Sequence, residues 1–255
     1  MLGRSAKARV SGAPAVTFDN RDAAYDFYRE HRPDLLRAKL SCAVMSHRFR
    51  PRVTYADGAR AELAQLIRAD ARLIISINHL TTQDPYLLAG LAWRSVFRPR
   101  IGRIRVLAKD ELFNDPQHRT RIDAMGGIPV FRGKDHGIRA AHAAGMQLID
   151  TCVYRLASGD DLAIFPEGTC NETDPTRVQP IGTGIGHILA RARDAGIAPT
   201  LVCIGLSYGL DTADVKSASF YLDSPCTNLP NRPTEISRMA SARMQQALDG
   251  ALRSY

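Results

Sequence analysis

Two short polar segments of the chain contain residue types that could catalyse acyl transfer to a hydroxyl group. His79 and Asp84 stand at the two ends of the run His-Leu-Thr-Thr-Gln-Asp. A carboxylate on one imidazole nitrogen fixes the tautomer and leaves the other nitrogen free to accept a proton, which is the arrangement of a general base for an alcohol. The second segment, residues 165–169 (Phe-Pro-Glu-Gly-Thr), predicts a loop that could hold an anion.

The elements around these segments predict that they meet at one edge of a sheet. Residues 72–77 are apolar and β-branched, which predicts a buried strand, and residues 160–165 predict a second one. Asp84 and Pro85 predict a helix start, with Asp84 as N-cap and the helix running to about residue 97. Ligands of open α/β sheets bind outside the carboxyl ends of the strands, where both segments would lie. The alternatives are a surface histidine beside an N-cap aspartate and an ordinary polar turn.

Two further basic residues follow strand-like runs. Arg132 ends the run 125–131, and an arginine there could bind a phosphate through a bidentate fork. Lys109 follows the strand-like run 105–108. For Arg132 the alternative is a strand-end arginine in water. Strands and helices alternate through the rest of the chain, which predicts an α/β fold with a mixed, mostly parallel sheet flanked by helices. Expected elements include helices at 136–158, 185–195 and 234–253 and strands at 200–206 and 220–222.

Three motifs occur in an order that resembles the glycerolipid acyltransferase family, most closely the bacterial 1-acyl-glycerol-3-phosphate acyltransferases. They are Asn-His-x4-Asp at 78–84, Gly-Ile-Pro-Val-Phe-Arg at 127–132 and Phe-Pro-Glu-Gly-Thr at 165–169. Residues 109–113 are similar to the family's lysine-containing segment, and 199–204 to its apolar, proline-led fourth strand. The resemblance extends over roughly residues 70–225.

The resemblance implies a mechanism in which His79 deprotonates the acceptor hydroxyl and Asp84 orients His79. The alkoxide would attack the thioester of acyl-CoA or an acyl-carrier protein directly, without a covalent intermediate, metal or cofactor. The expected acceptor is 1-acyl-glycerol-3-phosphate (lysophosphatidic acid), giving phosphatidic acid; the alternative is glycerol 3-phosphate or another lipid hydroxyl. Arg132 would bind the acceptor phosphate. The full set of residues expected to bind substrate is Asn78, Lys109, Arg132, Glu167, Gly168 and Thr169.

The chain departs from the family pattern at two places, and both concern the acceptor head group. Cys170 follows Thr169 where the family often has arginine or serine, and residues 179–184 lack the family's lysine. The five cysteines are scattered, odd in number and without zinc spacing, which predicts reduced thiols. Cys170 is accordingly expected to contribute packing alone.

The net charge of +8 is concentrated in two stretches. Leucines alternate with Arg37, Lys39 and Arg48 over an expected helix at 33–48, which predicts an amphipathic helix lying on an anionic membrane. The alternative is a helix packed on the domain with a solvated basic face. The second stretch, 89–108, has five arginines and no acidic residue: Arg94, Arg98, Arg100, Arg103 and Arg105.

The expected organisation is a disordered tail at 1–18, a helical membrane-associating segment at 19–60 and an acyltransferase domain at 61–255. No signal-peptide core is visible and no apolar run approaches the length of a membrane-spanning helix. The protein is therefore expected to be cytoplasmic and peripheral on the inner face of the cell membrane.

Two other functional classes are disfavoured by the motifs. Residues 205–209 match Gly-x-Ser-x-Gly around Ser207, but a nucleophile elbow needs a following helix and a later histidine, and the last histidine is His187. Ser207 is therefore expected simply to end a core strand. The pI of about 9.5 is compatible with nucleic-acid binding. No helix-turn-helix, zinc pattern or aromatic strand supports that function, so no nucleic-acid partner is expected.

Overall fold

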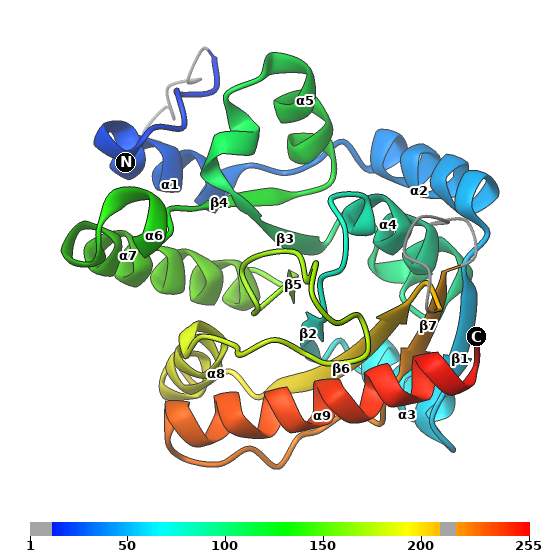
Figure 1. The fold of residues 1–255 in the computed structure, drawn as a ribbon. Helices are drawn as coiled ribbons and strands as arrows, with labels where there is room; N and C mark the ends of the chain where they lie inside the picture. Colours follow the sequence, from blue (N-terminus) through cyan, green and yellow to red (C-terminus); the bar gives the residue numbers. More distant parts are fainter. Residues whose placement is uncertain (1–11, 210–217) are drawn as a thin grey trace, which may run out of the picture.

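A computed structural model describes residues 12–209 and 218–255, apart from a few side chains between 134 and 141. Most of the expected disordered tail at 1–18 lies outside the described residues. The described residues form one sheet of seven strands in the order β1-β7-β6-β2-β5-β3-β4 (Figure 1). The strands are β1 (Arg52–Tyr55), β2 (Arg72–Ile77), β3 (Ile104–Lys109), β4 (Gly127–Val130), β5 (Asp161–Ile164), β6 (Pro199–Ser207) and β7 (Ser219–Leu222).

The strands from β2 to β6 are parallel to one another, whereas β7 runs antiparallel to β6 and β1 runs parallel to β7. The α-helices are α1 (Arg21–Glu30), α2 (Leu35–Phe49), α3 (Ala59–Arg68), α4 (Asp84–Arg94), α5 (Pro116–Ala124), α6 (Gly133–His136), α7 (Ile138–Ala157), α8 (Gly184–Asp194) and α9 (Pro233–Arg253). Short 3-10 helices are η1 (Phe18–Asn20), η2 (Arg98–Arg100) and η3 (Asp110–Phe113).

Helices cover both faces of the sheet, and β2 shows why. Leu73, Ile75 and Ile77 point to one face, where they share a core with residues of α2, α3 and α4. Ile74 points to the other face, whose core includes residues of α1, α7, α8 and α9. A strand that is apolar on both faces has to be covered on both. The prediction of an α/β fold with a mixed, mostly parallel sheet flanked by helices is confirmed.

The stretch expected to be a separate helical segment, 19–60, also contributes to this sheet. It contains α1 and α2, but β1 follows and pairs with β7 from Arg52↔Ser219 to Tyr55↔Leu222. Helix α1 packs against α7, and Tyr28 of α1 donates a hydrogen bond to Asp123, at 2.8 Å. In the described structure, therefore, residue 61 does not divide two separately packed units. No helix in the described part of the chain has both the length and the apolar composition needed to cross a membrane.

Candidate active site

His79 and Asp84 meet at the carboxyl end of β2. The Nδ1 atom of His79 lies 2.8 Å from Oδ2 of Asp84. The chain turns back between β2 and α4, as the sequence predicts, so that the two side chains face each other. Because a carboxylate can only accept, Nδ1 donates its proton to Asp84, and Nε2 is the nitrogen able to accept a proton from a ligand.

The carboxylate of Asp84 is completely buried and held by the loop before it. Oδ2 accepts hydrogen bonds from the backbone N–H of Leu80, at 2.6 Å, and of Thr81, at 3.0 Å. The Thr81 hydroxyl donates to Oδ1, at 2.9 Å. The prediction that Asp84 caps its helix is wrong, because this carboxylate points back toward the loop. Gln83 occupies the N-cap position, and Asp84 is the first residue of α4.

Tyr208 completes this arrangement and was not predicted from the sequence. Its phenol donates to Oδ1 of Asp84, at 2.6 Å, from just beyond the end of β6. Burial, followed by the charge of Asp84, raises the pKa of Tyr208, so the hydroxyl remains protonated and able to donate. No local pattern could have linked the two residues, since they are 124 positions apart and meet only because β6 pairs with β2.

The segment 165–171 fixes His79 from the neighbouring strand. The ring of Phe165 stacks on the imidazole, with centroids 4.3 Å apart. Glu167 accepts a hydrogen bond from the backbone N–H of His79, at 2.8 Å, and the N–H of Asn171 donates to the His79 carbonyl, at 2.7 Å. The two motifs therefore form one structure, as expected for loops after the adjacent parallel strands β2 and β5.

Two of the residues expected to bind substrate have protein partners instead. The second carboxylate oxygen of Glu167 accepts from the backbone N–H of Gln179, at 3.0 Å. Burial raises the pKa of Glu167, while these two backbone donors oppose the shift. Asn78 is buried, and its amide makes two hydrogen bonds with the backbone of Leu206, at 2.7 and 2.9 Å. Because their polar atoms are already bonded, Asn78 and Glu167 position the loops in this structure.

The remaining residues expected to bind substrate are partly exposed, as Arg132 and Lys109 are, or fully exposed. Arg132 donates to the carbonyl of Gly168, at 2.7 Å, and to the carboxylate of Asp135, also at 2.7 Å. The motif after β4 is thereby joined to the motif after β5. Thr169 is exposed, as is Gly168. Lys109, the last residue of β3, forms an ion pair with Glu111.

Cys170 differs from the expectation that it only packs. Its sulfur lies 3.5 Å from Nε2 of His79, the nitrogen opposite Asp84. Burial raises the pKa of the Cys170 thiol, and the nearby carboxylates of Asp84, Glu172 and Glu167 raise it further. The contact is therefore one between a protonated thiol and the imidazole.

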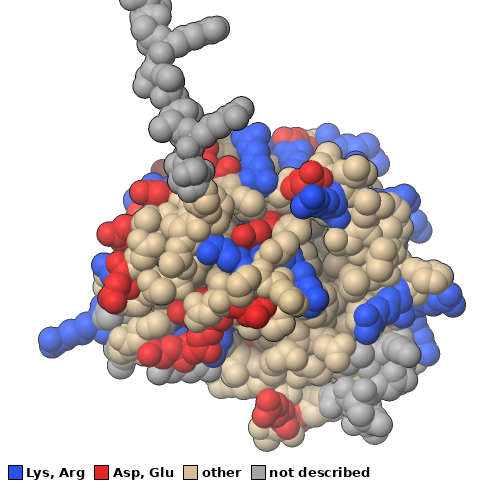
Figure 2. All heavy atoms as spheres, turned by 90° about the horizontal axis from the view of Figure 1, so that it is seen from above, with Lys and Arg blue, Asp and Glu red and all other residues tan. Residues whose placement is uncertain are grey.

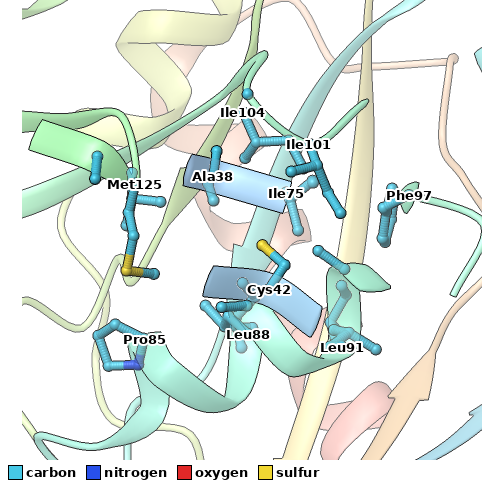
Figure 3. A pocket seen from close by; sticks show the side chains of 18 residues that line it. Ala38, Cys42, Ile75, Pro85, Leu88, Leu91, Phe97, Ile101, Ile104 and Met125 are labelled. Atoms are coloured by element: carbon cyan, nitrogen blue, oxygen red, sulfur yellow. The ribbon is translucent and has the colours of Figure 1, made fainter. Parts of the chain in front are cut away.

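An apolar pocket lies on the α2–α4 side of the sheet (Figure 3). Cys42 of α2 and Leu88 of α4 face each other across it, and Pro85, the neighbour of Asp84, forms part of its wall. Burial raises the pKa of Cys42 to about 11. The lining residues are apolar or small: Ala38, Cys42, Ile75, Ile77, Pro85, Leu88, Ala89, Leu91, Ala92, Phe97, Ile101, Gly102, Ile104, Val106, Ala124, Met125, Ala163 and Ile204.

The Gly-x-Ser-x-Gly run has a structural explanation in the described residues. Ser207 is 1% exposed, and its hydroxyl accepts from the N–H of Gly209, at 3.0 Å. A Cβ at Gly205 would lie 2.1 Å from the carbonyl oxygen of Ala247, so glycine is required where α9 crosses the sheet. Ser207 ends β6, as predicted; residues 210–217, which follow the motif, lie outside the described residues.

The comparison with known families agrees with this geometry. The family model described as Acyltransferase matches residues 59–204, which is more than half of the 255 residues and includes both His79 and the 165–169 segment. No curated protein matches the chain. The matched region carries the strands, the loops and the histidine–aspartate pair of the site. On these grounds the chain belongs to the acyltransferase family and is an enzyme of the O-acyltransferase type.

Proposed function

We propose that the protein transfers a fatty acyl group from acyl-CoA or an acyl-carrier protein to the free hydroxyl of 1-acyl-glycerol-3-phosphate, producing phosphatidic acid. The observation that carries the proposal is the 2.8 Å contact between His79 Nδ1 and the buried Asp84, inside a segment matched by the acyltransferase family. It supplies a histidine base that is oriented by a carboxylate.

In the proposed reaction, Nε2 of His79 takes the proton of the acceptor hydroxyl as its oxygen attacks the thioester carbonyl. The imidazolium that forms is stabilised by Asp84, which is buried and cannot be screened by water. His79 then returns the proton to the departing thiolate. Proton transfer by a positioned side chain contributes typically about 10²–10⁴-fold to a rate.

The donor's acyl chain is proposed to occupy the apolar pocket between α2 and α4. Its wall of aliphatic and small side chains suits a hydrocarbon, since burial of each methylene group contributes about 0.8 kcal/mol. Pro85 connects this pocket to the histidine–aspartate pair, because it directly follows Asp84.

Arg132 is proposed to bind the acceptor phosphate. Its guanidinium donates one hydrogen bond to the Gly168 carbonyl and one to the Asp135 carboxylate, and a phosphate in place of that carboxylate could be bound through a bidentate fork. Lys109 would add positive charge from the end of β3. We also propose that Gly168 and Thr169, exposed beside Arg132, border the head group.

Helix α2 supports the proposed attachment to the inner face of the cell membrane. Leu35, Leu36, Leu40 and Val44 are 51–68% exposed, an unusual cluster for one helix. Arg37, Lys39 and Arg48 are exposed on the same helix. In Figure 2 many basic atoms lie at the right, the side on which α2 lies in Figure 1, whereas acidic atoms lie mainly at the left. Such a surface fits anionic lipid, which is also where the substrate would be.

The experiment that tests the function measures thiol release from palmitoyl-CoA with and without lysophosphatidic acid, for wild type and His79→Ala. The expected result is acceptor-dependent release that falls by at least about 10²-fold in the variant. Release without acceptor would instead identify a thioesterase. Thiol release with glycerol 3-phosphate but not with lysophosphatidic acid would support acyl transfer by His79 and would identify glycerol 3-phosphate as the acceptor.

The same assay tests the proposed phosphate contact. Arg132→Ala is expected to raise the acceptor KM by about tenfold or more while the donor KM stays constant, because a charged hydrogen bond contributes about 1.5–3 kcal/mol. An unchanged acceptor KM would remove Arg132 from the phosphate site.

A further inference from the structure

We propose that Asp110 and His136 are positioning residues that hold Arg132 in place for the acceptor phosphate. The proposal rests on the proposed function and deepens it, because it assigns the support on which the phosphate contact depends. Neither residue was expected from the sequence to bind substrate. Both act through Arg132, so neither needs to touch the acceptor itself.

The contact that carries the proposal joins the segments that follow β3 and β4. Nε2 of His136 lies 2.8 Å from Oδ2 of Asp110. Asp110 begins η3 and directly follows Lys109, the last residue of β3. His136 is the last residue of α6, the one-turn helix that begins directly after Arg132. Because a carboxylate can only accept, Nε2 donates to Asp110 and fastens the end of α6 to the end of β3.

Arg132 is attached to this short helix by its backbone and by its side chain. Its carbonyl accepts hydrogen bonds from the backbone N–H of Asp135, at 3.1 Å, and of His136, at 3.2 Å. Its guanidinium donates to the carboxylate of Asp135, at 2.7 Å. A helix of four residues has little stability of its own, so its direction depends on what anchors it. The anchor at His136 therefore fixes the direction in which Arg132 leaves β4.

The surroundings of the pair make it a rigid anchor. Asp110 is buried, with 4% of its surface exposed. The imidazole of His136 stacks on the ring of Phe18, with centroids 5.0 Å apart, and meets the ring of Phe131 edge to face, at 5.6 Å. Aromatic contacts of this kind have preferred geometries and hold a ring in one orientation. The imidazole is thus fixed by a carboxylate and by two aromatic rings.

The N-terminal part of the chain contributes to this anchor. Phe18 belongs to η1, and Tyr25 of α1 meets the ring of Phe131 edge to face, at 5.8 Å. Helix α1 also packs against β4 (Figure 1). Both aromatic residues precede residue 59, where the match to the acyltransferase family begins. The support for Arg132 therefore combines the matched region with a segment of this chain that lies outside it.

A second histidine–carboxylate pair provides a matched control. His118 and Asp115 lie 3.9 Å apart in and beside α5, and both side chains are 54% exposed. This pair is solvated, whereas the pair of Asp110 and His136 is largely enclosed. Removal of His118 should therefore leave the position of Arg132 unchanged.

The test is a double-mutant cycle on acyl transfer to lysophosphatidic acid, with wild type, His136→Ala, Arg132→Ala and the variant that carries both substitutions. His136→Ala is expected to raise the acceptor KM by about threefold to tenfold and to leave the donor KM unchanged. In the Arg132→Ala background the same substitution should change the acceptor KM by less than about twofold, because residues that act through one contact are not additive.

Two further variants separate a positioning role from general support of the fold. His136→Gln, which keeps an N–H donor for Asp110, should restore most of the acceptor KM. His118→Ala should match wild type in both KM values. If His136→Ala does not fold, His136→Asn, whose side chain is too short to reach Asp110, takes its place in the cycle. Equal increases in the donor and acceptor KM would show a general loss of structure and would overturn the proposal.

Calorimetric binding of a water-soluble, short-chain lysophosphatidic acid, without donor, distinguishes this proposal from the proposed function. Binding that depends on Arg132 and weakens in His136→Ala, without any acyl transfer by wild type, would support the positioning pair and reject the proposed function. Transfer with an unchanged acceptor KM in His136→Ala, or with additive effects in the cycle, would overturn the pair and retain the function. A wild type that neither binds nor acylates this lipid would overturn both.

Discussion

At the scale of single residues, the site is defined by how completely Asp84 is bonded. Backbone, hydroxyl and phenol donors surround its carboxylate, in addition to the ring of His79. A buried carboxylate is stable as an anion only when such donors compensate for lost water. The same donors fix its position, so the imidazole opposite is held in one orientation.

Tyr208→Phe is expected to lower kcat by about tenfold to a hundredfold, because a hydrogen bond to a charged group contributes about 1.5–3 kcal/mol. The donor and acceptor KM should change little, since Tyr208 contacts Asp84 and not the proposed ligands. The measurement is steady-state kinetics on protein whose folding is verified by thermal unfolding.

Tyr55→Phe is the matched control for this prediction. It also removes a phenol that has a hydrogen-bond partner, the backbone N–H of Val96 at 3.3 Å, but lies away from His79. Its kcat should equal that of wild type. Equal kcat values for all three proteins would mean that Asp84 does not need the Tyr208 hydrogen bond.

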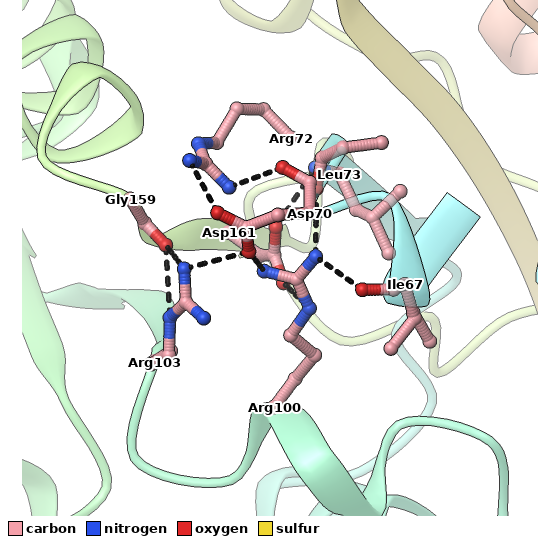
Figure 4. A network of polar contacts seen from close by, with 9 residues as sticks. Ile67, Asp70, Arg72, Leu73, Arg100, Arg103, Gly159 and Asp161 are labelled. Carbon is pink, nitrogen blue, oxygen red and sulfur yellow. Dashed lines mark hydrogen bonds and ion pairs between the residues drawn. The ribbon is translucent and has the colours of Figure 1, made fainter. Parts of the chain in front are cut away.

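At the scale of elements, the two ends of the parallel strands differ in the residues that they position. The carboxyl ends carry the candidate active site, whereas the amino ends are joined by an arginine network (Figure 4). Arg100 and Arg103 each bind the same oxygen of Asp70, at 2.9 and 3.0 Å, and Arg72 binds the other, at 2.9 Å. Asp161 lies within this network and accepts from the backbone N–H of Leu73, at 2.9 Å.

The five arginines of 89–108 therefore do not form one basic surface. Arg100 and Arg103 pair with Asp70, and Arg105 is buried against Asp160, at 2.8 Å. Their partners lie elsewhere in the chain, so a count of charges along 89–108 could not reveal them. Arg94 and Arg98 are the exposed members of the stretch.

Asp161 is expected to make stability fall as pH rises. Burial raises its pKa from 3.8 to about 6 despite the nearby arginines. The folded state therefore binds the proton more tightly, a contribution that is complete below pH 3.8 and is lost as pH rises through about 6. Asp161→Asn should remove this loss, which is on the order of 2–3 kcal/mol in the free energy of unfolding. Urea denaturation between pH 4 and 7 measures it.

Asp70→Asn serves as the comparison for that experiment. Hydrogen bonds from Arg72 and Arg103 lower the pKa of the exposed Asp70 in the folded protein. The stability that ionised Asp70 contributes is therefore lost only as pH falls below the pKa of this carboxyl in the unfolded chain. The difference between wild type and Asp70→Asn should thus stay constant from pH 5 to 7. If the difference between wild type and Asp161→Asn is also constant there, the raised pKa of Asp161 is contradicted.

Helix α2 provides a second prediction at this scale. Leu36→Glu combined with Leu40→Glu should weaken binding to vesicles containing phosphatidylglycerol by at least about tenfold, because each buried leucine contributes about 1.5–3 kcal/mol. Both side chains are more than half exposed, so the substitutions should leave the thermal unfolding temperature nearly unchanged. Vesicle co-sedimentation measures the binding.

Met146→Glu is the control for helix α2. Met146 is 47% exposed on α7, which covers the opposite face of the sheet. Vesicle binding by this variant should match wild type, and binding by wild type should weaken as salt is raised. Equal binding by the α2 variant and Met146→Glu would exclude α2 as the membrane contact.

At the scale of the whole molecule, the close packing of α9 determines where β6 and its loop lie. Gly205 of β6 approaches the backbone of α9 so closely that a Cβ would meet Ala247 and Leu248 at 2.1–2.4 Å. The same strand carries Leu206, which bonds Asn78, and leads into Tyr208. Helix packing on one face therefore supports hydrogen bonds at the site.

Gly205→Ala is expected to lower the free energy of unfolding by about 1–3 kcal/mol or more, because the backbone atoms it meets cannot rotate away. Chemical denaturation measures the effect. Gly145→Ala is the matched control: it lies in helix α7 with no neighbour within 4 Å, so it should raise stability by up to about 1 kcal/mol. A neutral Gly205→Ala would show that α9 can shift freely.

The local parts of the site could be predicted from the amino-acid sequence alone. The apolar runs specify buried strands. His79 and Asp84 are close in the sequence, so the turn after β2 alone is enough to bring their side chains together. Both loops were expected at the carboxyl edge, since parallel strands share that edge. These features depend on burial and backbone preferences, which act over short stretches and leave a pattern in the sequence.

The remaining contacts required the tertiary structure. Strand order places β2 between β6 and β5, and this order brings Tyr208 to Asp84 and Cys170 to His79 from distant parts of the chain. It also gives Asn78 and Glu167 backbone partners in place of a ligand, and gives Arg100 and Arg105 carboxylate partners in place of solvent. The packing of the whole sheet and its helices determines each of these partners. Such long-range contacts cannot be inferred from the spacing of residues in the sequence.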